Sequence, residues 1–509
     1  MPIIGKFLKK TSKEKFKKLT KQKRAFNLQI QSLFRLIDLG KDTTFGNKYR
    51  FNAVLLNPDL ASEFQKNVPI TNYNLFYKEW LKDSINGKKN HTWPGKIKYY
   101  ALSSGTNGAA SKRIPVSGQM IKSFQKTSIN QIATLYNLNL NDIVFSAKIL
   151  VVGGCSKIKK VENHFEGDLS GILKKNTSFI YSPFTLPPRK IANICDWNEK
   201  LEQMVIHAPK WDIGIVTGVP SWCILLMERI IEVYQLKSIH DIWPNFELYI
   251  HGGVFIQPYI DRLNRITNKK VHLLDTYLAS EGYFAFQAAT ENEGMQLLLE
   301  NGVFYEFIPF TSAYFDVEGN LKDDHEAFTL NQVEVGIDYA LVISTNAGLW
   351  RYLIGDLVQF LDVKKYEIII TGRIKEYLSL AGEHLSLDNI NKALVTVNKL
   401  LNVEISEFCV IADEKEQRHV WYIGSNMIVD KFDYIDKFDE ELKALNDDYS
   451  SCRKHNLKAP KIAVVEPDLF YLFLEEIGKS GSQHKFPRVL NKDQGMQWKL
   501  FLEKRGVSV

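Results

Sequence analysis

Residues 103–108 read Ser-Ser-Gly-Thr-Asn-Gly, and Lys112 follows shortly after them. The preceding stretch Lys96–Leu102 predicts a strand, and the apolar spacing from Met120 to Leu135 predicts a helix. Small hydroxyl residues and glycines between a strand and a helix can present backbone N–H groups and hydroxyls to a polyphosphate, and a lysine adds positive charge. A plain polar turn has the same composition, so this stretch alone leaves both interpretations open.

Several common nucleotide-binding and hydrolase motifs do not occur in the chain. We find no G-x-x-x-x-G-K-[ST] loop, no G-x-G-x-x-G after a strand, no H-E-x-x-H and no G-x-S-x-G. Each of these motifs has its own mechanism for holding phosphate, metal or nucleophile. Their absence argues against P-loop NTPases, Rossmann dehydrogenases, zincins and ordinary serine hydrolases.

Short apolar runs continue outward from this stretch and alternate with helical patterns, notably Trp222–Leu236. Such a mixture over residues 1–372 predicts a large α/β domain with more than one sheet. The expected strands lie at Ala147–Val152, Phe246–Ile250, Val271–Leu274, Val303–Ile308, Tyr339–Ile343, Leu353–Phe360 and Tyr366–Ile370.

The pattern changes after Thr371-Gly372-Arg373. Ser386 is a candidate N-cap for a helix over Leu387–Leu400. Phe408–Ile411 and His419–Ile423 flank a polar turn and predict a hairpin, and Phe432–His455 predicts one charged helix. These elements indicate a smaller, mobile α+β domain over residues 373–509, with the boundary near Gly372–Glu376.

Charge is concentrated at the start of the chain. The 509 residues carry a net charge of +7, but residues 1–24 hold ten Lys and Arg against Glu14, so the remainder is −2. A near-neutral body argues against a nucleic-acid-binding surface. A helix over residues 5–40 could be a solvated first helix or, less favoured, could touch an anionic membrane through residues 1–24.

The five cysteines are widely spaced and contain no C-x-x-C pair. This spacing indicates neither a zinc site nor a disulfide framework, and Cys155 is interpreted as a small buried residue. The N-terminus has no apolar run typical of a signal peptide, and no stretch is long enough to span a membrane. These observations predict a cytoplasmic protein.

Two further motifs carry acidic residues. In Tyr277-Leu278-Ala279-Ser280-Glu281-Gly282 the carboxylate follows an apolar run, where it could hold Mg²⁺. In Trp350-Arg351-Tyr352-Leu353-Ile354-Gly355-Asp356 the acid could accept hydrogen bonds from a ribose diol. Each motif alone is equally compatible with a solvated carboxylate or an ordinary turn.

The order of these motifs resembles the adenylate-forming superfamily, which includes acyl-CoA synthetases, adenylation domains of peptide synthetases and luciferases. The flanking sequences are similar to a bacterial member of the Gretchen Hagen auxin-responsive family, the acyl acid–amido synthetases. The resemblance extends from about residue 25 to about residue 490. Five stretches carry it: Asp42–Tyr49, Ser103–Pro115, Thr217–Trp222, Ala381–His384 and Gly481–Arg488.

This resemblance implies a two-step reaction. A carboxylic acid attacks the α-phosphate of ATP, with Mg²⁺ as cofactor, to give an acyl-adenylate and pyrophosphate. An amine, usually an amino acid, then displaces AMP and forms an amide. Rotation of the second domain would separate the two steps.

The resemblance also implies roles for individual residues. Ser103, Ser104, Gly105 and Thr106 would contact the phosphates. Tyr277 would lie against the adenine and Ser280 at the nucleotide. Asp356 and Arg373 would lie at the ribose, and Glu281 near Mg²⁺ and the α-phosphate. Lys485 would reach the α-phosphate as charge develops there, with Lys479 as the alternative. His384 could contact the nucleotide or have a purely structural role. The acyl pocket would include Val219, Trp222 and His251.

The phosphate loop departs from the common pattern. It reads Asn107-Gly108-Ala109-Ala110, where the common bacterial form has a second threonine and a later Gly-Lys. Fewer phosphate ligands leave an alternative open, a catalytically weak nucleotide- or acid-binding protein. A second alternative is a ligase that transfers the acyl group to a thiol such as CoA. The sequence names neither the acid nor the amine.

Overall fold

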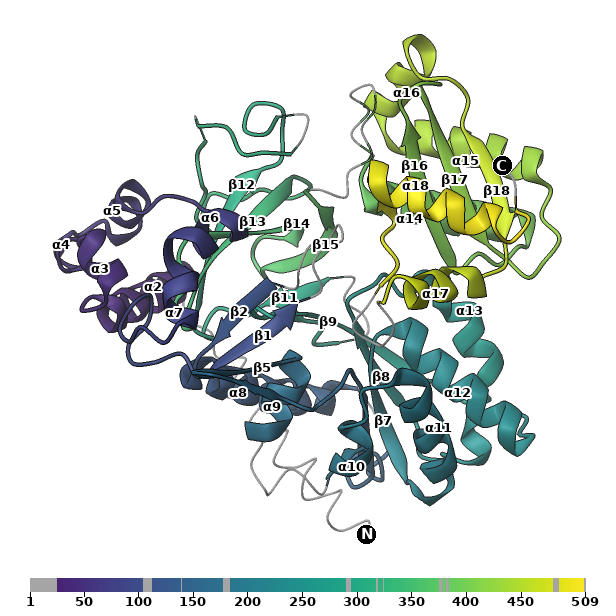
Figure 1. Cartoon of the computed structure of the whole chain (residues 1–509), viewed down its shortest axis with the longest axis horizontal. Helices are drawn as coiled ribbons and strands as arrows, with labels where there is room; N and C mark the ends of the chain where they lie inside the picture. The colour runs from purple at the N-terminus through teal and green to yellow at the C-terminus, as the bar shows by residue number, and fades with distance from the viewer. Residues whose placement is uncertain are drawn as a thin grey trace.

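The structure is a computed structural model that describes most of the chain (Figure 1). We refer to residues 25–374 as the large unit and to residues 385–507 as the C-terminal unit. The described residues are 25–103, 112–138, 140–176, 184–289, 294–316, 319–323, 325–374, 378, 380, 383, 385–478 and 485–507.

The largest sheet described in the large unit has eleven strands and two different halves. From β12 to β9 all neighbouring strands are antiparallel, whereas β9, β8, β7, β3 and β6 are mutually parallel. In spatial order the strands are β12 (Val303–Pro309), β13 (Asp338–Thr345), β14 (Tyr352–Asp362), β15 (Glu367–Arg373), β11 (Met295–Leu297), β10 (Gly282–Phe286), β9 (His272–Ala279), β8 (Leu248–Gly252), β7 (Ile213–Gly218), β3 (Lys148–Val152) and β6 (Thr185–Leu186).

A second, four-stranded sheet stands beside the first in the order β2-β1-β5-β4. Its strands are β1 (Tyr99–Ser103), β2 (Lys112–Val116), β4 (Lys159–Val161) and β5 (His164–Gly167). The helices of the large unit are α2 (Ala25–Gly40), α3 (Thr44–Lys48), α4 (Phe51–Leu56), α5 (Leu60–Asn67), α6 (Tyr73–Phe76), α7 (Lys82–Ile85), α8 (Gly118–Thr134), α9 (Leu169–Asn176), α10 (Arg189–Ala192), α11 (Trp197–His207), α12 (Pro220–Tyr234) and α13 (Gln257–Ile266).

Helices α11, α12 and α13 cover the parallel half, because parallel strands need crossover connections that place helices on the sheet faces. Apolar residues of these helices and of β7 and β8 form one buried cluster that includes Met204, Met227 and Trp243. Pro220 opens α12, a position where its missing N–H costs nothing. The cluster fixes the carboxyl ends of the parallel strands at one edge.

Helices α2 to α7 lie over the antiparallel half, at the opposite end of the large unit from α11 to α13 (Figure 1). The buried ring of Trp350 packs against Phe45, Phe51 and Phe64 from three of these helices. Arg351, the next residue, places these helices relative to strand β14, which enters the candidate site.

Arg351 forms a buried ion pair with Glu306 of β12. Its guanidinium nitrogens lie 2.8–3.1 Å from the Glu306 carboxylate oxygens and also donate to the carbonyl oxygens of Gln65 and Val68 at 2.8 and 2.6 Å. A buried charge without its partner is strongly destabilising, whereas a satisfied pair is tolerated. The pair therefore connects the end of α5 to two strands of the sheet.

We expect Glu306→Ala to lower the free energy of unfolding by about 3–5 kcal/mol, because it leaves the Arg351 charge buried and uncompensated. The measurement is the urea midpoint of the large unit, followed by tryptophan fluorescence. Glu334→Ala, at an exposed position, is the control and should change the free energy by less than about 0.5 kcal/mol. Equal midpoints for the two variants would contradict this role of the ion pair.

The C-terminal unit is a sheet between two helical layers. Strands run in the order β18-β17-β16-β19, and alternate residues of β16 and β17 face opposite sides. Phe408 and Trp421 pack with α14 and α15, whereas Cys409 and Tyr422 pack with α17 and α18. The elements are α14 (Leu387–Leu401), β16 (Glu407–Asp413), β17 (Arg418–Gly424), α15 (Lys431–Leu445), α16 (Asp447–His455), β18 (Lys461–Val465), α17 (Asp468–Glu476), β19 (Val489–Leu490) and α18 (Lys492–Glu503).

Most of the predicted elements are present, including the Ser386 N-cap and the hairpin β16–β17. The single predicted helix Phe432–His455 is wrong, because Asn446 adopts an extended conformation and its side chain caps a second helix, α16. The first predicted helix is described only from Ala25 onward. The division of the chain at Gly372–Glu376 into two domains stays a prediction.

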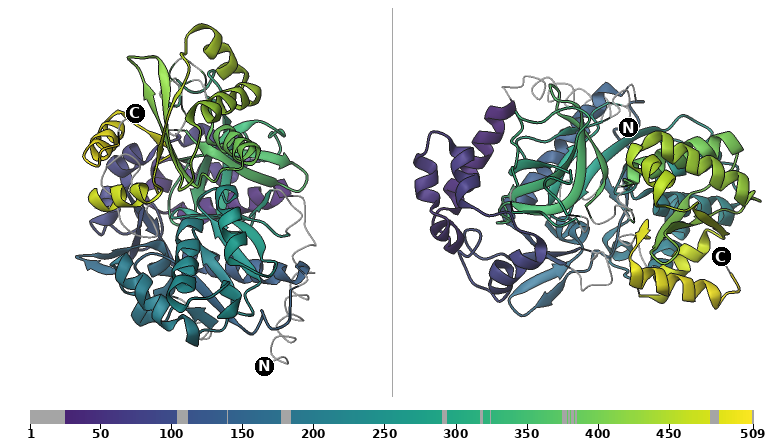
Figure 2. Two further views of the ribbon diagram at one scale, coloured as in Figure 1. Left: turned by 90° about the vertical axis from the view of Figure 1, so that its right-hand side faces the viewer. Right: turned by 90° about the horizontal axis from the view of Figure 1, so that it is seen from above.

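The two units meet on the side of α13 and α17, as two perpendicular views show (Figures 1 and 2). Tyr471 of α17 packs against the apolar cluster beneath α11 to α13. No helix in the part of the chain that the structure describes combines the length and the hydropathy needed to cross a bilayer.

Candidate active site

The residues expected at the site converge on one cavity between the two units. Its volume is ≈ 1890 Å³, which exceeds the usual range of about 300–1,000 Å³ for a small-ligand pocket. It opens at the carboxyl ends of β3, β7, β8 and β9, where ligands bind in open α/β sheets. The expected residues that line it are Ser103, Tyr277, Ser280, Glu281, Asp356, Arg373, Lys485, Val219 and His251.

The two ends of the candidate phosphate loop line this cavity. Ser103 ends β1 and Lys112 begins β2, and the two are paired across the antiparallel strands. The loop therefore connects two strands of the small sheet, which corrects the expected strand-to-helix connection. Ser104, Gly105 and Thr106 lie outside the described residues, as do His384 and Lys479.

Glu281 lies in the two-residue turn that joins β9 to the antiparallel strand β10. Its side chain is buried at the cavity wall. Burial raises the pKa of Glu281, the nearby cation Lys112 opposes this shift, and the nearby Asp356 carboxylate adds to it.

Asp356 sits at an irregularity of β14 rather than in a simple turn. The register of β13 against β14 shifts here, and Gly355 has a φ of +96°, a conformation that favours glycine. The bulge presents the carboxylate, which is 8 % exposed, to the cavity. Tyr277 donates to one carboxylate oxygen at 2.6 Å and Arg373 to the other at 2.7 Å. Asp356 is therefore held in one orientation by two donors.

Lys485 brings a cation from the C-terminal unit to the cavity. Its ammonium group donates a hydrogen bond to the carbonyl oxygen of Gly253, which follows β8. Gly253 has a φ of +86°, and a Cβ there would lie 2.6 Å from the lysine nitrogen. The glycine thus allows the lysine to approach the ends of the parallel strands.

Of the three residues expected in the acyl pocket, two line the cavity and one does not. Val219 and His251 line the cavity, and His251 Nδ1 lies 3.4 Å from a carboxylate oxygen of Asp275. Trp222 is not part of the cavity wall that the structure describes. Its ring packs edge-on against Trp197 at 4.5 Å within the cluster beneath α11 to α13. An amphipathic helix faces the core through its apolar stripe, so Trp222 is a core residue.

Sequence reasoning missed much of the apolar wall. Ile132 belongs to the apolar spacing that predicts the helix from Met120 to Leu135 and that is typical of a core face, but it is 38 % exposed and lines the cavity together with Ile129. Helical periodicity marks an apolar face without distinguishing a core from a pocket, so no signal in the chain separates the two. The α8 and α9 residues that line the cavity are Phe124, Gln125, Ser128, Ile129, Gln131, Ile132, Leu169, Ser170, Leu173 and Lys174.

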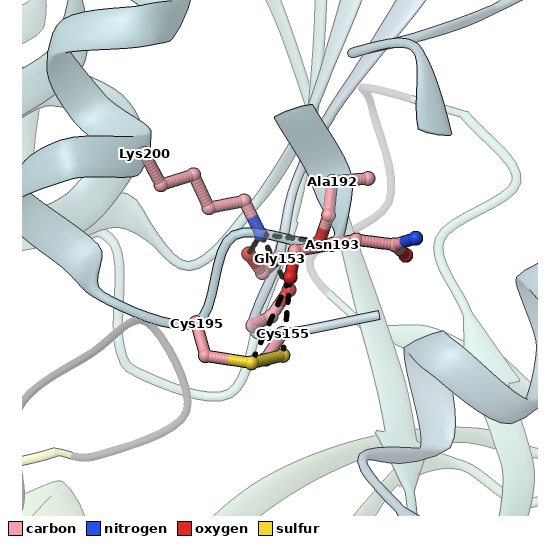
Figure 3. The surroundings of a disulfide bond; sticks show 7 residues. Gly153, Cys155, Ala192, Asn193, Cys195 and Lys200 are labelled. Carbon is pink, nitrogen blue, oxygen red and sulfur yellow. Dashed lines mark hydrogen bonds between the residues drawn. A yellow bond between two sulfur atoms is a disulfide. The ribbon is translucent and has the colours of Figure 1, made fainter. Parts of the chain in front are cut away.

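A disulfide joins Cys155 to Cys195, forty residues later, beside the same wall (Figure 3). This corrects two expectations, namely that no disulfide is present and that Cys155 is simply buried. Among the described residues, Cys223, Cys409 and Cys452 do not take part in this disulfide. The pairing depends on how the intervening chain returns past β3, which cysteine spacing alone does not reveal. The cysteines therefore give no support to the predicted cytoplasmic location, because disulfides are rare in the cytosol.

Lys200 is buried and connects the two segments that carry Cys155 and Cys195. Its ammonium group donates to the carbonyl oxygens of Gly153, Gly154 and Ala192 at 2.8, 2.5 and 3.3 Å (Figure 3). Burial lowers the pKa of Lys200 to about 8, with Asp168 opposing the shift. The backbone of this wall is thus fixed by a lysine that the sequence did not single out.

Family models match three stretches of the chain. These are the GH3 family N-terminal domain over residues 12–162, the central domain over residues 296–373 and the C-terminal domain over residues 388–494. Together they account for about two-thirds of the sequence. The chain belongs to the GH3 family.

Similar proteins within the GH3 family include plant enzymes. The putative indole-3-acetic acid-amido synthetase GH3.9 of Arabidopsis thaliana is 25% identical over 290 residues, 50% of this chain and 46% of that protein. The indole-3-acetic acid-amido synthetase GH3.5 of the same plant is 24% identical over 275 residues, 48% of this chain and 45% of that protein. The chain thus spans less than half the length of these curated relatives.

Solved structures establish the fold over nearly the whole chain. A GH3.15 acyl acid amido synthetase in complex with 2,4-DB has a TM-score of 0.77 at 17% identity, covering 98% of this chain and 96% of that one. A 2-hydroxyisobutyryl-CoA ligase in complex with 2-HIB-AMP has a TM-score of 0.61 at 11% identity, covering 94% and 91%. The GH3 chain described here therefore has the fold of adenylate-forming ligases, as predicted.

Proposed function

We propose that this GH3 protein activates a carboxylic acid with ATP and transfers the acyl group to an amine, releasing pyrophosphate and AMP. The observation that carries the proposal is the convergence of Glu281, Asp356, Arg373 and Lys485, from four separate stretches, on one cavity. Family membership and the named activities of the plant relatives support the same reaction class. The division into a large domain and a mobile C-terminal domain is part of this proposal.

The geometry suggests where the nucleotide binds. Asp356 would accept hydrogen bonds from the ribose hydroxyls, with Tyr277 and Arg373 holding its orientation. The phosphates would lie toward Ser103 and Lys112, at the ends of the loop 104–111. Lys485 would approach the α-phosphate and stabilise negative charge as the acid attacks.

The acid would occupy the apolar part of the cavity between α8, α9 and the ends of the parallel strands. Side chains such as Phe124, Ile129 and Ile132 offer contact area to an apolar acyl body but few directional contacts. The carboxylate of such an acid would point toward Lys485 and the α-phosphate. These contacts favour an acid with a substantial apolar portion.

Glu281 fits a Mg²⁺ site in which substrate phosphates supply the other ligands. The described residues contain no group of three or more His, Cys, Asp or Glu that could hold a metal by themselves. Mg²⁺ commonly binds through one or two carboxylates together with substrate phosphates, which one acidic side chain here would satisfy. Bound there, it would neutralise charge on the phosphates and on the leaving pyrophosphate.

This assignment predicts a pH dependence. Burial raises the pKa of Glu281, and only the ionised form, present above that pKa, binds a cation. We expect the adenylation rate to fall as the pH drops through this raised pKa. A roughly tenfold increase in Mg²⁺ should move the fall to lower pH in the wild type. Glu281→Gln should be slow and should lose this response, and a variant that keeps it would exclude Glu281 as the ligand.

A thiol acceptor is the second candidate, because the fold is shared with a CoA ligase. The test incubates the protein with ATP, a panel of aryl and aliphatic acids, and either amino acids or CoA, followed by mass spectrometry of the products. We expect an amide and AMP with one acid and one or more amino acids. A thioester formed only with CoA would replace the amide proposal. AMP formation without either product would contradict transfer to both acceptors.

A further inference from the structure

A buried polar network crosses the interface between the two units next to Lys485. Glu407, at the start of β16, is 3 % exposed and lies at its centre. Arg488 donates to one carboxylate oxygen at 2.7 Å, and Tyr471 of α17 donates to the other at 2.8 Å. Both donors belong to the C-terminal unit. The third donor, Tyr259 of α13, belongs to the large unit and lies 2.7 Å from the same oxygen as Tyr471.

The network is directly connected to Lys485 through the chain. Arg488 follows three residues later, and it also donates to the carbonyl oxygen of Phe408 at 3.0 Å. Its own carbonyl oxygen accepts from the N–H of Val410 at 2.9 Å. The segment that carries Lys485 is therefore fixed to β16, and β16 is fixed to the large unit through Tyr259.

We propose that Tyr259 is a positioning residue that holds the C-terminal unit in the arrangement that places Lys485 in the cavity. This inference rests on the proposed function, because it assigns the arrangement to the adenylation step. If the C-terminal unit moves away from the large unit, Glu407 still accepts hydrogen bonds from Arg488 and Tyr471. Its carboxylate therefore stays paired whether the units are docked or apart. Of the three hydrogen bonds to Glu407, only the one from Tyr259 joins the two units, and it therefore shifts the equilibrium toward the docked arrangement.

Burial distinguishes this bond from an ion pair that also crosses the interface. Arg265 of α13 pairs with Glu404, but its side chain is 61 % exposed. Exposed ion pairs contribute little because water and salt screen them. Tyr259 is 1 % exposed and bonds a carboxylate, and hydrogen bonds to charged groups are the stronger kind. The buried tyrosine is thus the contact whose loss should be measurable.

The test compares the two half-reactions in Tyr259→Phe, which removes the hydroxyl and keeps the ring. We expect acid-dependent exchange of pyrophosphate into ATP to fall about tenfold, equivalent to ~1.4 kcal/mol. We expect the reaction of preformed acyl-adenylate with the amine to keep its rate or to accelerate. A simple loss of structure would slow both, so an equal fall of both half-reactions would overturn the proposal, as would no change in exchange.

Two matched variants complete the design. Tyr471→Phe removes a hydroxyl from the same carboxylate oxygen but within the C-terminal unit, so the ratio of the two half-reactions should stay within about threefold of wild type. Arg265→Ala removes the exposed pair and should behave likewise. A change of the ratio in Tyr471→Phe as large as in Tyr259→Phe would mean that the charge of Glu407, rather than docking, is responsible.

A physical readout separates this proposal from the proposed function. Energy transfer between dyes carried by unnatural amino acids at the exposed positions Leu56 and Ile428 reports how the two units are arranged. We expect Tyr259→Phe to reduce the population with the docked distance and Tyr471→Phe to leave it unchanged. If no acid supports exchange in the wild type, the proposed function fails, yet this distance measurement still decides whether Tyr259 holds the units together. Identical distance distributions in all three proteins would overturn the proposal.

Discussion

Replacement of Lys485 by alanine should lower the rate of acyl-adenylate formation about 10²–10³-fold, with little change in the KM for ATP. Lys485 lines the same cavity as Glu281 and Asp356, and the proposed function places its ammonium group near the α-phosphate. A preorganised cation that meets charge developed in the transition state contributes about this much to a rate. Because the charge grows only during attack, the loss should appear in kcat rather than in KM.

Pre-steady-state measurement of pyrophosphate release checks this expectation. Lys492→Ala is the control, since that lysine belongs to the same unit and its side chain is 84 % exposed. Its rate should stay within about twofold of the wild type. If Lys485→Ala released pyrophosphate as fast as Lys492→Ala, the assignment of Lys485 would be wrong, and Lys479 would become the candidate.

The second large effect concerns Asp356. We expect Asp356→Asn to raise the KM for ATP about 10–100-fold, because hydrogen bonds to a charged acceptor contribute about 1.5–3 kcal/mol and the amide keeps only the shape. The substitution also weakens the contacts from Tyr277 and Arg373, which fix the orientation of the side chain. The measurement is the KM for ATP and for 2′-deoxy-ATP in both proteins.

The comparison between the two nucleotides isolates the ribose contact. The wild type should prefer ATP to 2′-deoxy-ATP, and Asp356→Asn should lose most of that preference. Asp362→Asn carries the same substitution on the same strand at a position outside the described cavity wall, and it should retain wild-type values. Full discrimination between the nucleotides in Asp356→Asn would show that another group binds the ribose.

The sequence contained enough information to predict the fold class, because several motifs and flanking stretches occur in one order along the chain. Local chemistry also predicted particular elements, as with the Ser386 N-cap and the β16–β17 hairpin. It failed where two structures share one pattern. The apolar helical spacing did not reveal that Ile132 lines the cavity, and the family resemblance implied a pocket position for Trp222, which lies in the core.

Other parts of the site depend on contacts between distant residues, which spacing in the chain cannot reveal. The Cys155–Cys195 disulfide forms because two loops meet beside β3, and Lys200 holds those same loops through three carbonyl oxygens. The Tyr259–Glu407 bond connects residues 148 positions apart. The bulge at Gly355 was interpreted as an ordinary turn because a glycine before an acid is common in both.

The central claim is that this GH3 protein makes an acyl-adenylate, and acid-dependent exchange of labelled pyrophosphate into ATP tests it most directly. The assay uses the full chain with Mg²⁺ and a panel of apolar aryl and aliphatic carboxylic acids, with Lys485→Ala in parallel. Our account predicts exchange that requires one of these acids and falls about 10²–10³-fold in the variant. Exchange that proceeds equally without any acid, or equally in Lys485→Ala, would contradict it.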